Sequence, residues 1–211
     1  MAVILKKTLE DGSLLGIWEI TEDIQLLLDQ VNFSASELER FNGFQSNARK
    51  LEFLSVRALL RKMLNRVVRI IYNGNRKPYL DDGSYNISIS HSKKLTSILL
   101  NSKKRVGIDL EYMSHRIREV AHKFINDNES IKKNAPTEKY HLYIHWCAKE
   151  ALYKICDKKD LNFRLHLLIK PFHVNDKGII KGKVDNEQIS EEFDLTYFKY
   201  DNYIIVYTSK D

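Results

Sequence analysis

Two stretches with different periodicities, residues 105–111 and residues 143–155, constrain the fold of this chain most strongly. Residues 105–111 alternate between apolar and other side chains, which is typical of a β-strand with one buried face. The apolar positions of this strand are Val106, Ile108 and Leu110. The two-residue period places Asp109 and Glu111 together on the opposite side, pointing away from the apolar face.

Residues 143–155 have the spacing of an amphipathic α-helix. One apolar row at this spacing contains Tyr143, Cys147, Ala151 and Ile155. Glu150 and Lys154 stand one turn apart on its flank, in line with Trp146. A strand with two carboxylates and a helix with a third can build a magnesium–phosphate site, because Mg²⁺ combines a few carboxylates with water and phosphate oxygens. The alternative is a strand with two exposed acids beside a helix with a surface ion pair.

Four short motifs then resemble the 4′-phosphopantetheinyl transferase superfamily. Residues 107–111 (GIDLE) resemble its G-[IV]-D strand, and residues 146–154 (WCAKEALYK) resemble its W-x-x-K-E-[AS]-x-x-K helix. Residues 77–79 (KPY) resemble the family's G-K-P segment, and residues 89–92 (ISHS) its strand-end S-H-S. The order and spacing of the four motifs also agree. One departure is Arg76, which stands where the family usually has glycine.

The resemblance implies a fold as well as a family. The length suggests the larger, two-lobed branch, of the surfactin-synthetase-activating type. Its architecture is α+β, with two similar (pseudo-duplicated) lobes that each pack a small antiparallel sheet against a main helix. The active site would lie in the cleft between them. We place the boundary in the polar turn 101–104, so that residues 1–102 form the N-terminal lobe and residues 103–211 form the C-terminal lobe with the metal site.

The resemblance further implies the transfer of 4′-phosphopantetheine from coenzyme A to a serine of an acyl or peptidyl carrier protein. This is the magnesium-dependent holo-[acyl-carrier-protein] synthase reaction, and it releases adenosine 3′,5′-bisphosphate. Asp109, Glu111 and Glu150 fit as magnesium ligands, and Lys154 can reach a phosphate oxygen. The general base is Glu150 or a metal-bound water, with Glu129, on a polar stretch twenty residues after Asp109, as the second candidate. Without a cation, the converging acids would repel one another.

Coenzyme A would be held at its nucleotide end by residues that match the other two motifs. Those residues are Lys77, Pro78, Ser90 and His91. The predicted helix over residues 46–65 carries Arg57 and Arg61 one turn apart on a basic edge. In the family the corresponding helix flanks the coenzyme, so Arg57 joins the expected coenzyme A site.

The net charge of +6 suits an acidic carrier protein as the partner. The alternatives are a magnesium-dependent nuclease, which the KPY and SHS motifs do not support, and a basic nucleic-acid-binding module, against which the acidic cluster argues. We therefore expect no nucleic acid partner, and we expect a monomer. The apolar runs are too short for a signal peptide or a membrane span. Cys147 and Cys156 lie about 13 Å apart along one helix, too far for a disulfide, which favours a reduced, cytoplasmic protein.

The remaining elements follow from capping and periodicity. We expect strands within residues 1–20, a short helix capped by Thr21, and a helix that begins with a capping box between Ser34 and Glu37. Further helices are predicted over residues 116–133 and 138–157. Strands are predicted over residues 67–72, 86–90, 95–100, 172–174, 178–184, 193–200 and 203–207.

Overall fold

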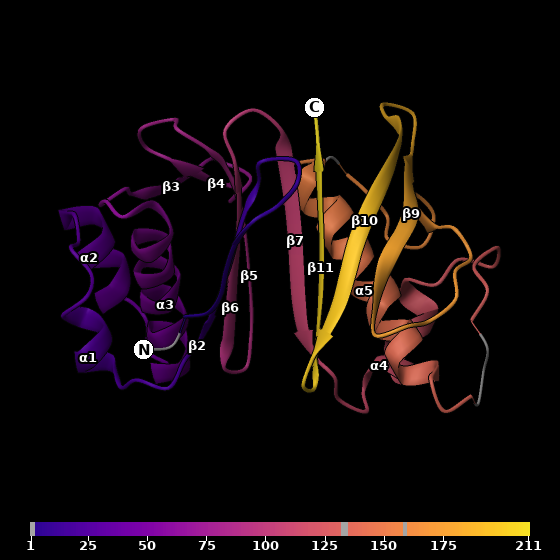
Figure 1. Ribbon diagram of the computed structural model, residues 1–211, viewed down its shortest axis with the longest axis horizontal. Coiled ribbons are helices and arrows are strands. Elements are labelled where there is room, and N and C mark those ends of the chain that lie inside the picture. Colours follow the sequence, from indigo (N-terminus) through magenta and orange to yellow (C-terminus); the bar gives the residue numbers. More distant parts are fainter. Residues whose placement is uncertain (1–2, 132–134, 158–159) are drawn as a thin grey trace. The chain divides into compact units, whose positions relative to one another are not determined.

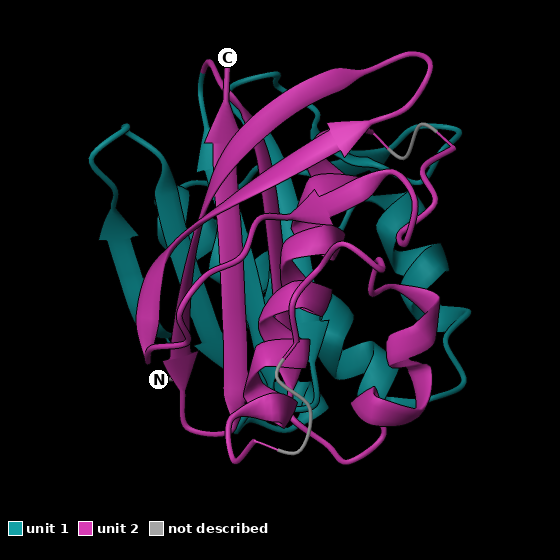
Figure 2. Cartoon of the chain, turned by 90° about the vertical axis from the view of Figure 1, so that its right-hand side faces the viewer, with its two compact units in different colours: residues 1–102 teal, residues 103–211 magenta. Residues whose placement is uncertain are grey.

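Two compact units make up the chain, Met1–Ser102 and Lys103–Asp211. The computed structural model describes residues 3–131, 135–157 and 160–211. Each unit combines helices with antiparallel strands, so the α+β class is confirmed (Figure 1). In each unit, an 18-residue helix packs against a sheet, and Figure 2 distinguishes the two units by colour. The internal duplication stays a prediction.

The first unit holds a four-stranded sheet in the order β1-β2-β6-β5 and a separate β3–β4 hairpin. Its strands are β1 (Val3–Thr8), β2 (Leu14–Glu19), β3 (Ile70–Tyr72), β4 (Pro78–Leu80), β5 (Asn86–Ser92) and β6 (Leu95–Asn101). Its helices are α1 (Ile24–Leu28), α2 (Ala35–Asn42) and α3 (Asn47–Leu64). Helix α3 covers β2 and β6, and the core between them contains Leu54, Leu59 and Ile98.

The start of α2 has the predicted capping box. Ser34 Oγ accepts a hydrogen bond from the Glu37 amide, and the Glu37 carboxylate accepts one from the Ser34 amide. The same carboxylate also accepts from Arg57 Nε at 2.8 Å, and the guanidinium carbon lies 3.3 Å from the centroid of the Phe53 ring. Arg57 is therefore buried and does not form the predicted basic edge with Arg61, which is exposed.

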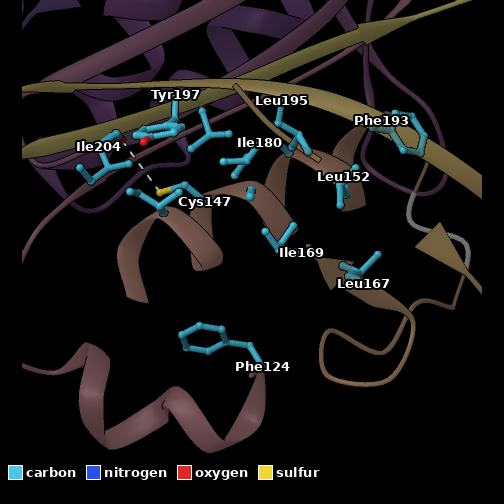
Figure 3. Close-up of a cluster of buried hydrophobic side chains, with 14 of the residues drawn as sticks. Phe124, Cys147, Leu152, Leu167, Ile169, Ile180, Phe193, Leu195, Tyr197 and Ile204 are labelled. Carbon is cyan, nitrogen blue, oxygen red and sulfur yellow. Dashed lines mark hydrogen bonds between the residues drawn. The ribbon is translucent and has the colours of Figure 1, made fainter. Parts of the chain in front are cut away.

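The second unit holds one five-stranded antiparallel sheet in the order β7-β11-β10-β9-β8. Its strands are β7 (Arg105–Tyr112), β8 (Leu167–Ile169), β9 (Lys177–Asp185), β10 (Ser190–Tyr200) and β11 (Tyr203–Lys210). Its helices are α4 (Ile117–Val120), the 3₁₀ turn η1 (Ala121–Lys123) and α5 (Glu138–Ile155). The predicted apolar row of α5 is buried against the sheet, where Cys147 Sγ lies 3.9 Å from the Ile204 carbonyl (Figure 3).

Several predicted elements differ from the structure, and of the strand expected over residues 67–72 only Ile70–Tyr72 forms. The helix expected over residues 116–133 ends at Lys123, because Asn126 and Glu129 form side-chain hydrogen bonds to backbone amides of the following loop, and such bonds compete with a helix. Residues 132–133 of that prediction lie outside the described residues. Helix α1 is capped by Asp23 instead of Thr21. Residues 172–174, which directly follow Pro171, form no strand, while the unpredicted strand β8 lies just before them.

Among the described residues, no helix combines the length and the apolar character that crossing a membrane requires. Cys147 and Cys156 form no disulfide with each other, as their spacing predicts, and both are buried.

Candidate functional site

The two stretches that open the sequence argument, now β7 and α5, lie directly against each other. Gly107 makes this close approach possible. A Cβ atom at this position would lie 2.2 Å from the Ala151 carbonyl oxygen and 3.1 Å from Ile155 Cβ. Because the first of these contacts is with helix backbone, only glycine fits here without moving α5.

Asp109 follows on the same face of β7 and reaches the last turn of α5. Its Oδ1 accepts a hydrogen bond from Lys154 Nζ at 2.7 Å, and Nζ also donates to the Ile108 carbonyl at 2.9 Å. The Asp109 side chain is only 5% exposed, against 21% for Lys154. The strand is thus buried on both faces, since Val106 and Leu110 are buried too, and the prediction of a single buried face is wrong.

Glu111 and Glu150 complete the predicted acidic group, and both are half-buried. Burial raises the pKa of the Cys147 thiol, and the charges of Asp109 and Glu111 raise it further, so both carboxylates act on the same point of α5. Glu150 lies on the next turn of this helix, one turn before Lys154. The acids therefore come from two packed elements of the second unit.

These carboxylates have the donor chemistry that magnesium requires, which is oxygen ligands of negative charge. The ammonium group of Lys154 beside Asp109 shows that a cation fits at this carboxylate. Within residues 3–131, 135–157 and 160–211, no three His, Cys, Asp or Glu side chains are grouped closely enough to hold a metal ion. The carboxylates of Asp109, Glu111 and Glu150 suit magnesium in their chemistry, but in this structure they do not lie close enough together to hold it, and their role as its ligands remains a proposal.

The candidate nucleotide-binding residues lie in the first unit. Lys77 precedes β4 in a turn shaped by Asn73, whose side-chain oxygen accepts from the Lys77 amide at 2.9 Å. Arg76 has a φ of +62°, the left-handed conformation that favours glycine. This backbone conformation explains why a glycine suits the position before the lysine-proline pair, and it shows that Arg76 adopts the same turn at some cost in strain.

His91 lies within β5, which extends two residues beyond the predicted strand end. Its Nε2 is 2.9 Å from Arg49 Nη1 and its Nδ1 is 3.4 Å from Glu52 Oε1. Because a guanidinium only donates, Nε2 accepts and Nδ1 carries the proton. Arg49 is thus a cation at the end of β5 that sequence reasoning missed. The spacing of Arg49 and Glu52, three residues apart on one helix, can be recognised in the sequence. The contact of Arg49 with His91 cannot, because it joins residues 42 positions apart.

The other predicted coenzyme A residues divide into two groups. Ser90 is buried beside His91, and Pro78 is the half-buried first residue of β4, a strand that packs against β5. Arg57 is held by Glu37 inside the unit, so a phosphate could reach it only after that ion pair opened. We therefore leave Arg57 out of the proposed site.

Glu129, the second candidate for the general base, is buried and bonded on both oxygens. Oε2 accepts from Lys149 Nζ and from the Asn126 amide, each at 2.7 Å. Burial alone would raise the pKa of Glu129, but His145, Lys149 and the Asn126 amide lower it below its usual value. A buried carboxylate with a lowered pKa is a poor acceptor of a substrate proton, which leaves Glu150 or a metal-bound water as the better candidate.

Comparison with known proteins gives two matches. Residues 105–208, which include β7 and α5, match the family described as the 4′-phosphopantetheinyl transferase superfamily. A curated relative, the 4′-phosphopantetheinyl transferase HetI of Nostoc sp. (strain PCC 7120 / SAG 25.82 / UTEX 2576), is 27% identical over 157 residues. That alignment covers 65% of this chain and 66% of the relative's length.

Proposed function

Since the chain belongs to the 4′-phosphopantetheinyl transferase superfamily, we propose that it transfers the 4′-phosphopantetheine group of coenzyme A to a serine of an acyl or peptidyl carrier protein. The observation that carries the proposal is the packing of β7 on α5. Gly107 lets the helix approach the strand, and Asp109 then meets Lys154 at 2.7 Å. This pairing brings acidic and basic side chains from two family motifs together within the matched region.

The reaction requires a serine oxygen to attack a phosphorus atom of the pyrophosphate, with adenosine 3′,5′-bisphosphate as the leaving group. Glu150 takes the serine proton, because it is half-buried and lies one helical turn from Lys154. Lys154 donates to a phosphate oxygen from its position beside Asp109. Bound magnesium, held by Asp109, Glu111 and Glu150, would offset negative charge on the phosphates.

The nucleotide end of coenzyme A binds the basic group of the first unit. Lys77 and His91 contact phosphate, Ser90 and Pro78 line the same strands, and Arg49 adds a charge beside His91. Arg49 is able to turn from the imidazole to a phosphate because its side chain is about half exposed. The net charge of +6 favours an acidic carrier domain as the second substrate, and we propose that the chain acts as a monomer.

Intact-mass measurement tests the activity. The purified chain, coenzyme A and magnesium are incubated with a panel of apo-carrier domains of fatty acid, polyketide and peptide synthesis. We expect at least one carrier to gain the mass of a single phosphopantetheine, and its serine-to-alanine variant to gain nothing. If no carrier changes mass while a nucleic acid is cleaved, the chain is a nuclease instead.

Lys77→Ala and His91→Ala are expected to weaken coenzyme A binding by about 10- to 150-fold, since a charge-assisted hydrogen bond contributes roughly 1.5–3 kcal/mol. The loss for Lys77→Ala should shrink at high salt, because screening already weakens the contact in the parent protein. Calorimetry with coenzyme A measures both effects. Lys7→Ala is the matched control, since Lys7 is exposed on β1, the opposite edge of the sheet from β5. Parental affinity in both site variants would remove the two residues from the site.

A further inference from the structure

Lys149, the residue before Glu150, is fully buried and charged. Its side chain is 0% exposed, and its Nζ donates to Glu129 Oε2 at 2.7 Å, to the Phe163 carbonyl at 3.1 Å and to the Phe124 carbonyl. In Figure 3 the Phe124 side chain lies between α5 and the helical segment that precedes Phe124. The ammonium group thus ties α5 to two loops, one before the helix and one after it.

Glu129 extends these ties to the sheet. Its Oε1 accepts from the Ile169 amide at the end of β8, at 2.7 Å, while Oε2 holds the Asn126 amide and Lys149. One carboxylate, 2% exposed, therefore joins β8, the loop after η1 and α5. Removing either charge would leave its partner buried without compensation, which is among the most costly changes in a protein interior.

His145 lies against this ion pair from the preceding turn of α5. Its Nδ1 is 3.6 Å from Glu129 Oε1, beyond hydrogen-bond distance, and its side chain is 1% exposed. Neither ring nitrogen has a hydrogen-bond partner among the described residues. The His141 ring lies 5.0 Å away and the Phe172 ring 5.5 Å away, centroid to centroid. A proton on His145 would add a second positive charge beside Lys149 in this closed space.

We propose that Glu129 is a positioning residue that fixes the Glu150 and Lys154 face of α5 through Lys149, and that His145 makes this clamp sensitive to acid. The inference rests on the proposed function, because positioning matters only if this face of α5 carries out the transfer. The clamp consists of Glu129, Lys149 and His145. In this clamp Glu129 is not the general base, since it acts through Lys149 and touches no substrate.

The direction of the acid effect follows from the surroundings of His145. The titratable or charged groups that act on His145 or touch its ring are His141 and Lys149 on α5 and Glu129 on the loop after η1, while Tyr197 on β10 lies beyond the Phe172 ring. Burial lowers the pKa of His141 to about 4 and lowers that of His145, although Glu129 opposes the shift of His145. A histidine in the unfolded chain binds a proton below about pH 6.5. Below this pH the unfolded chain therefore binds protons that the folded clamp does not bind. The two buried histidines therefore leave stability unchanged above about pH 6.5 and cost stability as the pH falls below it, in the case of His141 down to about pH 4.

A double-variant cycle separates positioning from general-base catalysis. We expect Glu129→Gln and Lys149→Met each to lower the melting temperature by about 10 °C and kcat by more than tenfold. The double variant removes both charges, so it should regain more than half of each loss. A double variant that recovers its melting temperature but stays as inactive as Glu129→Gln would make Glu129 the base and overturn the proposal. Single variants with the melting temperature and the kcat of the parent would overturn the proposal as well.

His145→Leu tests the acid sensitivity, with His115→Leu as the control because His115 is exposed on the same unit. We expect the acidic limb of kcat and of the melting temperature to move at least half a pH unit lower in His145→Leu and to stay in place in His115→Leu. An unchanged acidic limb in His145→Leu overturns the role of His145. If the parent transfers nothing to any carrier, the proposed function fails and the positioning role fails with it. If the parent transfers phosphopantetheine but the melting temperatures of the double-variant cycle show no coupling between Glu129 and Lys149, this inference alone fails.

Discussion

Glu150→Gln is expected to lower phosphopantetheine transfer at least about a hundredfold, because the amide can neither accept the serine proton nor bind magnesium as a carboxylate does. The substitution keeps the size of the side chain, and Glu150 is half-buried on α5, so the melting temperature should change little. Transfer rates, melting curves and magnesium affinity measured by calorimetry with coenzyme A check the three expectations. Glu187→Gln, an exposed change in the second unit, is the control.

Asp109→Asn should lose transfer to a similar extent but differ in stability. Asp109 holds the Lys154 ammonium from a buried position, so removing its charge costs about 1–3 kcal/mol and several degrees of melting temperature. Converging acids would repel one another when no metal is bound, but Asp109 escapes this repulsion because Lys154 neutralises it. If both variants transfer at the parental rate with parental magnesium affinity, the acidic group is not the site.

Local patterns predict much of this fold. The alternation of residues 105–111 gives the strand and the shared face of Asp109 and Glu111, and the apolar row of residues 143–155 gives the buried side of α5. The capping box of Ser34 and Glu37 is present in full. These predictions succeed because each depends on residues no more than about twelve positions apart, within which the geometry of a helix or strand is nearly fixed.

The predictions that fail depend on distant partners. Arg57 looks exposed by helical position, but Glu37, twenty residues earlier, draws it into the interior. Glu129 looks like a solvated or catalytic acid until Lys149, twenty residues later, pairs with it in the core. Buried charges occur only where a partner compensates them, and neither partner can be identified from spacing alone. The burial of Asp109 has the same origin, since α5 covers a face of β7 that periodicity predicts as exposed.

Gly107→Ala is expected to destabilise the second unit by at least about 3 kcal/mol, or roughly 10 °C in melting temperature, and to abolish most transfer. The added methyl would lie 2.2 Å from the Ala151 carbonyl oxygen, so α5 itself must move. Because Asp109 and Lys154 meet across this contact, the shift separates the groups proposed to act together. Thermal melting and the carrier mass assay measure the two losses.

Two other glycines make the test quantitative. At Gly182 an added Cβ would lie 2.8 Å and 2.9 Å from the ends of the Leu195 and Leu152 side chains, which can rotate away, so Gly182→Ala should lose only a few degrees. At Gly74 nothing lies within 4 Å, so Gly74→Ala should melt like the parent or slightly higher. The expected order of loss is Gly107, Gly182, Gly74, because helix backbone yields less than a side-chain end. If Gly107→Ala melts near the parent and still transfers, the close approach of α5 to β7 is not what assembles the site.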